Sequence, residues 1–200
     1  VKGKAEPVRV YEVNAAKAEP GRLRGLAGLE SAMVGRDSEL KALIKVSAAV
    51  SAKIGRVAVI IGEPGLGKSR LISEWKTSAG ATQFQWAEGR CLSYGQRLAY
   101  HLLIDLIHSL IGVPITAEEA ETNTALKRLA DDLFGDAALD VYPYLGHLLS
   151  LDLTGAALER VKPLDPQALQ TQYLAGLRQL LTTLASRQPL ILIFDDIHWA

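Results

Sequence analysis

Residues 62–69 read Gly-Glu-Pro-Gly-Leu-Gly-Lys-Ser and match every fixed position of the phosphate-binding loop G-x-x-x-x-G-K-[ST]. Three glycines let this backbone turn tightly, so that several N–H groups can point into one concavity. Lys68 supplies a full positive charge to the β- and γ-phosphates of a nucleotide, and the Ser69 hydroxyl is suited to bind Mg²⁺. The pattern predicts a nucleotide-binding set made of Gly62, Glu63, Pro64, Gly65, Leu66, Gly67, Lys68 and Ser69.

Two carboxylates near the end of the chain could complete the same chemistry. The apolar run 189–194 is typical of a buried parallel strand, and it is followed by Asp195 and Asp196. Because ligands of open α/β sheets bind beyond the carboxyl ends of such strands, this is a Walker B pattern. We expect Asp195 to bind Mg²⁺ together with Ser69, and Asp196 to activate the attacking water as a catalytic residue alongside Lys68. The alternative for the pair is an acidic turn after a core strand.

A strand, the loop and a helix must follow one another for a phosphate loop to form, and the flanking residues provide this order. The apolar run 54–61 predicts a core strand before the loop, and residues 69–78 predict a helix after it. Hydrophobic spacing predicts further strands over residues 7–13, 83–89 and 190–194. Helices are expected over residues 98–110, 117–134, 136–151 (broken at Pro143) and 170–186, and Asp37 or Ser38 could cap one more helix, which continues to about residue 49. The predicted fold class is therefore α/β.

Composition fits a globular chain that works in a reducing compartment. The 200 residues are 48% hydrophobic and 22% charged, and their formal net charge is zero, which argues against a nucleic acid partner. Cys91 is the sole cysteine, so we expect a packed thiol, no disulfide framework and a cytoplasmic location. The sequence shows neither a secretory signal nor an apolar run of about 20 residues, so we expect no membrane association.

A weaker metal-like trio is formed by His101, Asp105 and His108, whose spacing allows them to share one helix face. A solvated polar face is the favoured interpretation of these three side chains.

Several segments together resemble the STAND branch of the AAA+ P-loop ATPases, which are ATPase modules of multidomain bacterial signalling proteins. They are residues 34–40 (VGRDSEL), the loop 62–69, residues 89–95 followed by Tyr100, and the ending 194–200 (FDDIHWA). The resemblance covers about residues 33–200. It implies a P-loop NTPase fold of three layers, α/β/α, with a mostly parallel sheet that is truncated after the Walker B strand. It also implies ATP as the nucleotide and places Val34, Gly35 and Arg36 near the adenine, with an ordinary turn before a helix as the alternative.

The leading segment, residues 2–13, resembles the last strand of a class III adenylate/guanylate cyclase domain, which often precedes an ATPase module of this kind. We therefore expect residues 1–13 to end a cyclase-like domain, residues 14–32 to be a linker, and residues 33–200 to be the first part of the ATPase domain. The absence of an initial Met and the end at Ala200 indicate a piece of a longer protein. In that parent, cyclase-like and helical-repeat domains would be covalently linked partners. An unrelated strand is the alternative for residues 2–13.

The two motifs and the resemblance favour a module that binds ATP with Mg²⁺, hydrolyses it slowly and acts as a regulatory switch. One alternative is that the longer protein is a cyclase that synthesises cyclic nucleotides. This fragment could not catalyse that reaction, because the metal-binding carboxylates of the cyclase would precede Val1. Another is a nucleotide-binding interaction module without hydrolysis, and nucleotide-dependent oligomerisation stays open. The resemblance also implies a later strand between the two motif strands, so we expect the chain alone to be marginally stable.

Overall fold

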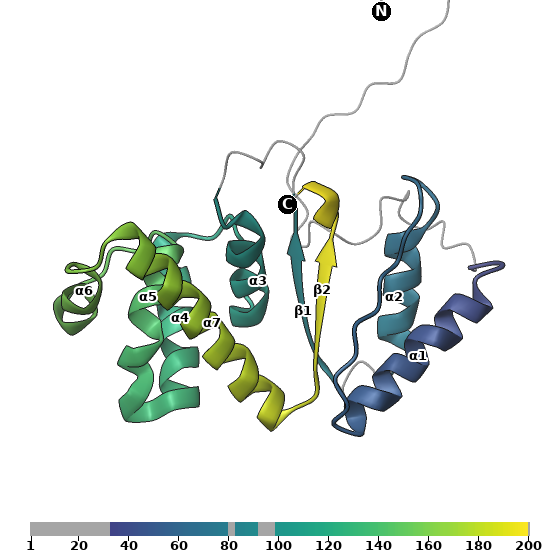
Figure 1. The fold of residues 1–200 in the computed structure, drawn as a ribbon, viewed down its shortest axis with the longest axis horizontal. Helices are drawn as coiled ribbons and strands as arrows, with labels where there is room; N and C mark the ends of the chain where they lie inside the picture. The colour runs from purple at the N-terminus through teal and green to yellow at the C-terminus, as the bar shows by residue number, and fades with distance from the viewer. Residues whose placement is uncertain (1–32, 80–82, 92–98, 200) are drawn as a thin grey trace, which may run out of the picture.

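The computed structural model describes residues 33–79, 83–91 and 99–199 of the chain. Its sheet consists of two parallel strands, β1 (Gln85–Arg90) and β2 (Leu190–Asp195), which lie between two groups of helices (Figure 1). The predicted strand at residues 7–13, the linker 14–32 and most of the loop that follows β1 lie outside the described residues.

The helices before β1 form one group, and the helices between β1 and β2 form the other. The first group is α1 (Asp37–Ser51) and α2 (Lys68–Ser78). The second group is α3 (His101–Ile111), α4 (Glu119–Phe134), the 3-10 helix η2 (Gly135–Asp140), α5 (Tyr142–Leu148), α6 (Gly155–Val161) and α7 (Pro166–Arg187). A last 3-10 helix, η3 (Ile197–Trp199), follows β2.

The two faces of the sheet pack against two separate hydrophobic clusters. Side chains alternate between the faces of a strand, and Ala87 and Leu192 contact the larger cluster, which α3–α7 build. Trp86 and Ile193 contact the smaller cluster, which contains Trp75 of α2. The parallel strands are thus covered on both faces, as the continuous apolar sequence of β2 predicts.

The expected strands over 83–89 and 190–194 are confirmed as β1 and β2, and most expected helices are present with shifted ends. The helix α7 begins earlier than predicted, because the Asp165 side chain accepts a hydrogen bond from the Ala168 N–H (2.8 Å) and Pro166 occupies the first turn. In the stretch 136–151 the break falls at Val141 instead of Pro143, since Pro143 lies in the first turn of α5, where its missing N–H costs no helical bond. The short helix α6 was not predicted.

The start of α1 also differs from the prediction. The helix begins at Asp37 with Arg36 in the capping position, and no side chain caps it. The Ser38 hydroxyl instead donates a hydrogen bond to the Glu39 carboxylate (2.6 Å).

The prediction of a core strand over residues 54–61 is wrong for this structure. These residues have no regular secondary structure, and Val57, Val59 and Ile61 are 92%, 77% and 91% exposed. A strand requires hydrogen bonds from a neighbouring strand, and the sheet of the described residues contains only β1 and β2. Of the apolar side chains in this segment, Ile60 packs against the smaller cluster, and Val57, Val59 and Ile61 lie in solvent.

Candidate functional site

The phosphate loop connects the segment 54–61 to α2 at the end of the molecule where β1 and β2 also finish (Figure 1). Gly65 and Gly67 adopt φ angles of 85° and 81°, a left-handed conformation that glycine takes without steric cost. Gly67 is also the residue that precedes α2, so this turn aims the first N–H groups of the helix toward the loop. The predicted sequence of turn and helix N-terminus is therefore present.

Lys68 lies against its own loop. Its ammonium group donates hydrogen bonds to the backbone carbonyls of Gly62 (2.8 Å) and Glu63 (3.1 Å). Ser69 follows in the first turn of α2 and is exposed to solvent. A charged amine, a hydroxyl and the positive end of a helix thus gather at one place, which is the set of groups that binds phosphate.

Arg36 contacts the same loop from the start of α1. Its guanidinium donates a hydrogen bond to the Leu66 carbonyl (3.3 Å) and pairs with the Glu39 carboxylate (2.7 Å). The Ser38 hydroxyl and then Arg36 lower the pKa of Glu39 from 4.5 to about 2. Of the three residues expected near the adenine, Arg36 therefore contacts the phosphate loop, and Val34 and Gly35 are exposed.

The two carboxylates of the Walker B pattern lie at the end of β2. Asp195 is the last residue of the strand and is half-buried, whereas Asp196 is exposed. The Asp196 N–H donates to the Asp195 carboxylate (3.1 Å), and Asp196 has a φ of 56°, which is uncommon outside glycine. Backbone conformations of this kind are concentrated at functional sites.

The chemistry of these side chains fits a magnesium ion held with a nucleotide. Mg²⁺ prefers hard oxygen ligands and takes few of them from the protein when phosphates are present. The Ser69 hydroxyl and the Asp195 carboxylate are ligands of that kind. Among the described residues no group of three or more His, Cys, Asp or Glu could hold a metal ion by itself.

The favoured interpretation of His101, Asp105 and His108 of α3 as a solvated polar face is wrong, because His108 is buried, the other two are half-buried, and all three make other contacts. The Asp105 carboxylate accepts a hydrogen bond from the Arg90 N–H (2.8 Å), and a ring nitrogen of His101 lies 3.3 Å from the Arg90 carbonyl. His108 bonds the Val113 carbonyl (3.2 Å). The first two residues therefore hold the end of β1, a role that the sequence did not indicate because it depends on how α3 packs.

Cys91 follows β1 and is a buried thiol, as expected. Its N–H donates to the Asp195 carbonyl (3.1 Å), which ties the ends of the two strands together. Burial raises the pKa of the Cys91 thiol, and the nearby Asp196 carboxylate raises it further. This thiol is therefore a poor nucleophile.

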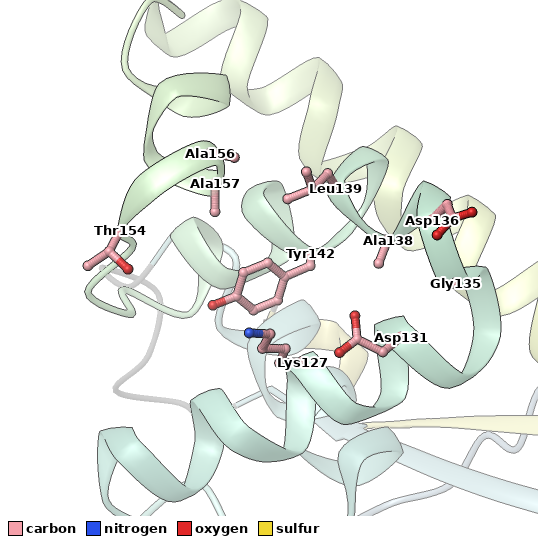
Figure 2. A pocket seen from close by; sticks show the side chains of 10 residues that line it. All are labelled: Lys127, Asp131, Gly135, Asp136, Ala138, Leu139, Tyr142, Thr154, Ala156 and Ala157. Carbon is pink, nitrogen blue, oxygen red and sulfur yellow. The ribbon is translucent and has the colours of Figure 1, made fainter.

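A hollow of about 350 Å³ lies elsewhere, on the helices between the strands (Figure 2). Lys127, Asp131 and Tyr142 line it together with small side chains of η2 and α6. The Tyr142 hydroxyl donates to the Asn123 side chain (2.7 Å), and burial raises the pKa of Tyr142. None of its lining residues belongs to the phosphate loop or to β2, so we do not assign the predicted chemistry to this hollow.

Comparison with known proteins agrees with the phosphate loop. Residues 32–200 match the family described as AAA ATPase domain. The chain is also similar to an uncharacterized protein of Rhizobium meliloti (strain 1021), with 25% identity over 201 aligned residues. That alignment covers all of this chain and 19% of the relative's length. No solved structure matches the chain. In the part of the chain that the structure describes, no helix has the length and apolarity needed to cross a membrane.

Proposed function

Because the chain belongs to the AAA ATPase domain family, we propose that it binds ATP with Mg²⁺ through residues 62–69 and acts as a slow hydrolytic switch. The observation that carries the proposal is the phosphate loop itself. Gly65 and Gly67 are left-handed, Lys68 lies against the loop, and α2 begins directly behind it. The end of β2, which carries Asp195 and is followed by Asp196, lies at the same end of the molecule (Figure 1).

Each side chain has a separate part in this proposal. Lys68 exchanges the carbonyls of Gly62 and Glu63 for the β- and γ-phosphates, which are stronger partners for an ammonium group. Ser69 and Asp195 hold Mg²⁺, which when bound neutralises charge on the phosphates. Asp196 orients the attacking water and accepts its proton, and ADP and phosphate are the products.

ATP hydrolysis by two variants tests the catalytic part. We expect Asp196→Asn to abolish phosphate release and to retain ATP binding, because an amide cannot accept the proton from water. We expect Lys68→Ala to weaken binding and hydrolysis together. Phosphate release that continues unchanged in Asp196→Asn would exclude the assigned role of Asp196. Binding with no phosphate release from the unmodified chain would favour a static interaction module.

For the longer protein we propose a cyclase-like domain that ends at residues 1–13, a linker at 14–32 and an ATPase domain from residue 33, in the cytoplasm. Helical repeats would follow the ATPase domain. The resemblance of residues 2–13 to a cyclase strand supports this arrangement. A cyclase assay on the 200-residue chain tests the boundary. No cyclic nucleotide should form, and its formation would show that the cyclase chemistry lies within this chain.

A further inference from the structure

Arg90 ends β1 directly beside the Walker B carboxylate. In the register of the two parallel strands, Arg90 is paired with Asp195, and neighbouring strands are about 4.8 Å apart. Trp86 contacts the hydrophobic cluster of α2, and side chains two and four residues later project from the same face. The same alternation from Ile191 and Ile193 places Asp195 on this face. Arg90 and Asp195 are therefore neighbours on the face that α2 covers.

The backbone of Arg90 is fixed from three sides. Asp105 accepts its N–H, His101 lies at its carbonyl, and the Cys91 N–H that follows bonds the Asp195 carbonyl. These contacts require α3 to approach closely at Gly89, where a Cβ atom would lie 2.8 Å from the Leu102 carbonyl oxygen. An arginine that only points into solvent does not need its backbone fixed by three hydrogen bonds, so this arrangement favours a defined position for the Arg90 side chain.

The guanidinium of Arg90 is held loosely by comparison. It lies 3.5 Å from the Glu88 carboxylate, and its side chain is 45% exposed. Glu88 also pairs with Lys76 of α2, so one carboxylate is shared between two cations. Arg90 and burial both lower the pKa of Lys76, burial more strongly, which agrees with two cations lying close together. An exposed ion pair of this kind is weak and can be exchanged for a more highly charged partner.

We propose that Arg90 is a further substrate-contacting residue, whose guanidinium leaves Glu88 and pairs with the terminal phosphate of a bound nucleoside triphosphate. Arginine presents a planar fork of N–H donors that matches phosphate oxygens. The proposal rests on the proposed function, which places Mg²⁺ and the attacking water at Asp195 and Asp196, next to Arg90. A diphosphate lacks the terminal group, so Arg90 stays with Glu88 and the two nucleotide states differ in this ion pair.

The test compares the affinities of ADP and of an ATP analogue with a methylene β–γ bridge, both with Mg²⁺, by calorimetry on the 200-residue chain. Replacement of Arg90 by Gln should weaken binding of the triphosphate by roughly tenfold to a hundredfold, the usual effect of losing a hydrogen bond between charged groups. Its affinity for ADP should not change. The matched control is Arg187→Gln, because Arg187 is 48% exposed and pairs with Asp132 on α4, away from the loop.

A second variant separates the proposal from a purely structural role. Glu88→Gln removes the carboxylate that pairs with Arg90, so this variant should bind the triphosphate more tightly relative to ADP. If the ion pair were only structural, Arg90→Gln and Glu88→Gln would both lose affinity for the triphosphate by the same factor. This variant also keeps the test valid if Arg90→Gln does not fold, which circular dichroism would reveal. Equal losses for both nucleotides, or weaker triphosphate binding in Glu88→Gln, would overturn the role of Arg90. An unmodified chain that binds neither nucleotide would overturn the proposed function and this inference with it.

Discussion

Gly89 is the residue at which α3 comes closest to β1. A Cβ atom there would lie 2.8 Å from the Leu102 carbonyl oxygen and 3.0 Å from a Leu102 methyl carbon. Backbone atoms cannot move aside as a flexible side chain can, so a larger residue would push α3 away from the strand. The positions of His101 and Asp105, and with them the end of β1, depend on this one glycine.

We expect Gly89→Ala to destabilise the chain by about 1–3 kcal/mol, the usual effect of overpacking a tight contact. Urea denaturation measures the change in free energy of unfolding. Gly55→Ala is the matched control, because a Cβ atom at Gly55 has no neighbour within 4 Å. Similar effects at both positions would show that the close approach of α3 at Gly89 does not limit stability.

His108 predicts a dependence of stability on pH. Burial lowers the pKa of His108 from 6.5, and the hydrogen bond to Val113 opposes this effect only in part. The unfolded chain therefore binds more protons, so stability is fully present above pH 6.5 and is lost as the pH falls through the lower folded-state pKa. The urea midpoint should decrease between about pH 7.5 and about pH 5.5. A decrease of the same size in His108→Gln would assign the effect to other groups.

The sequence was sufficient to place the helix after the phosphate loop and the strand that carries the two carboxylates, because each motif requires only local spacing, whereas the strand predicted before the loop is absent. It could not predict that Arg90 lies beside Asp195. That position depends on the register of β1 and β2, which are separated in sequence by the helices α3–α7. It also could not reveal why Asp105 and His101 are present. Their partner is the backbone of Arg90, and backbone contacts leave no pattern of residue types.

Among the elements, the segment 54–61 differs most from its prediction. An apolar run predicts a strand because the side chains of a central strand are buried. A central strand needs a hydrogen-bonded strand on each side. Here Val57, Val59 and Ile61 are exposed, and within the described part of the chain β2 pairs only with β1. We propose that a further strand, which the resemblance implies, lies between this segment and β2 in the longer protein.

Hydrogen exchange measured by mass spectrometry tests the state of this segment. Amides of residues 55–61 should exchange without protection, because no strand ladder holds them, whereas the Ile54 N–H donates to the Ala49 carbonyl (2.9 Å). Amides of α7 should exchange slowly, because Leu177, Leu180 and Leu184 bury this helix in the larger cluster. Strong protection at residues 55–61 would mean that the segment is paired in solution.

The helices were easier to predict than the strands. Their apolar faces repeat within the helix, and the capping Asp165 lies next to the residues it caps. Their ends were less certain, since the start of α1 at Asp37 uses no side-chain cap. The short helix α6 escaped prediction because seven residues give too little periodicity.

The whole molecule contains two hydrophobic clusters of unequal size. The larger cluster joins α3–α7 and one face of the sheet, and the smaller joins α1, α2 and the other face. Trp75 and Trp86 meet edge to face in the smaller cluster, with 4.9 Å between ring centroids. Because the smaller cluster buries fewer apolar side chains, we expect the half that carries the phosphate loop to be the less stable half.

We expect urea to unfold the chain in two stages and at low concentration. Tryptophan fluorescence should report the early loss of the smaller cluster, and far-ultraviolet circular dichroism the later loss of the helices α3–α7. The exposed apolar side chains of residues 54–61 add a tendency to aggregate. A single, sharply cooperative transition at high urea, seen equally by both signals, would contradict this description.

Binding of a fluorescent ATP analogue with Mg²⁺ tests the central claim most directly. It should be measured on the 200-residue chain, on Lys68→Ala, and on Lys45→Ala as a control, because Lys45 is an exposed lysine of α1. We expect saturable binding to the chain and to the control, and its loss in Lys68→Ala, because Lys68 supplies the charge for the phosphates. Binding that persists unchanged in Lys68→Ala, or an absence of binding to the unmodified chain, would contradict the claim that residues 62–69 form a working nucleotide site.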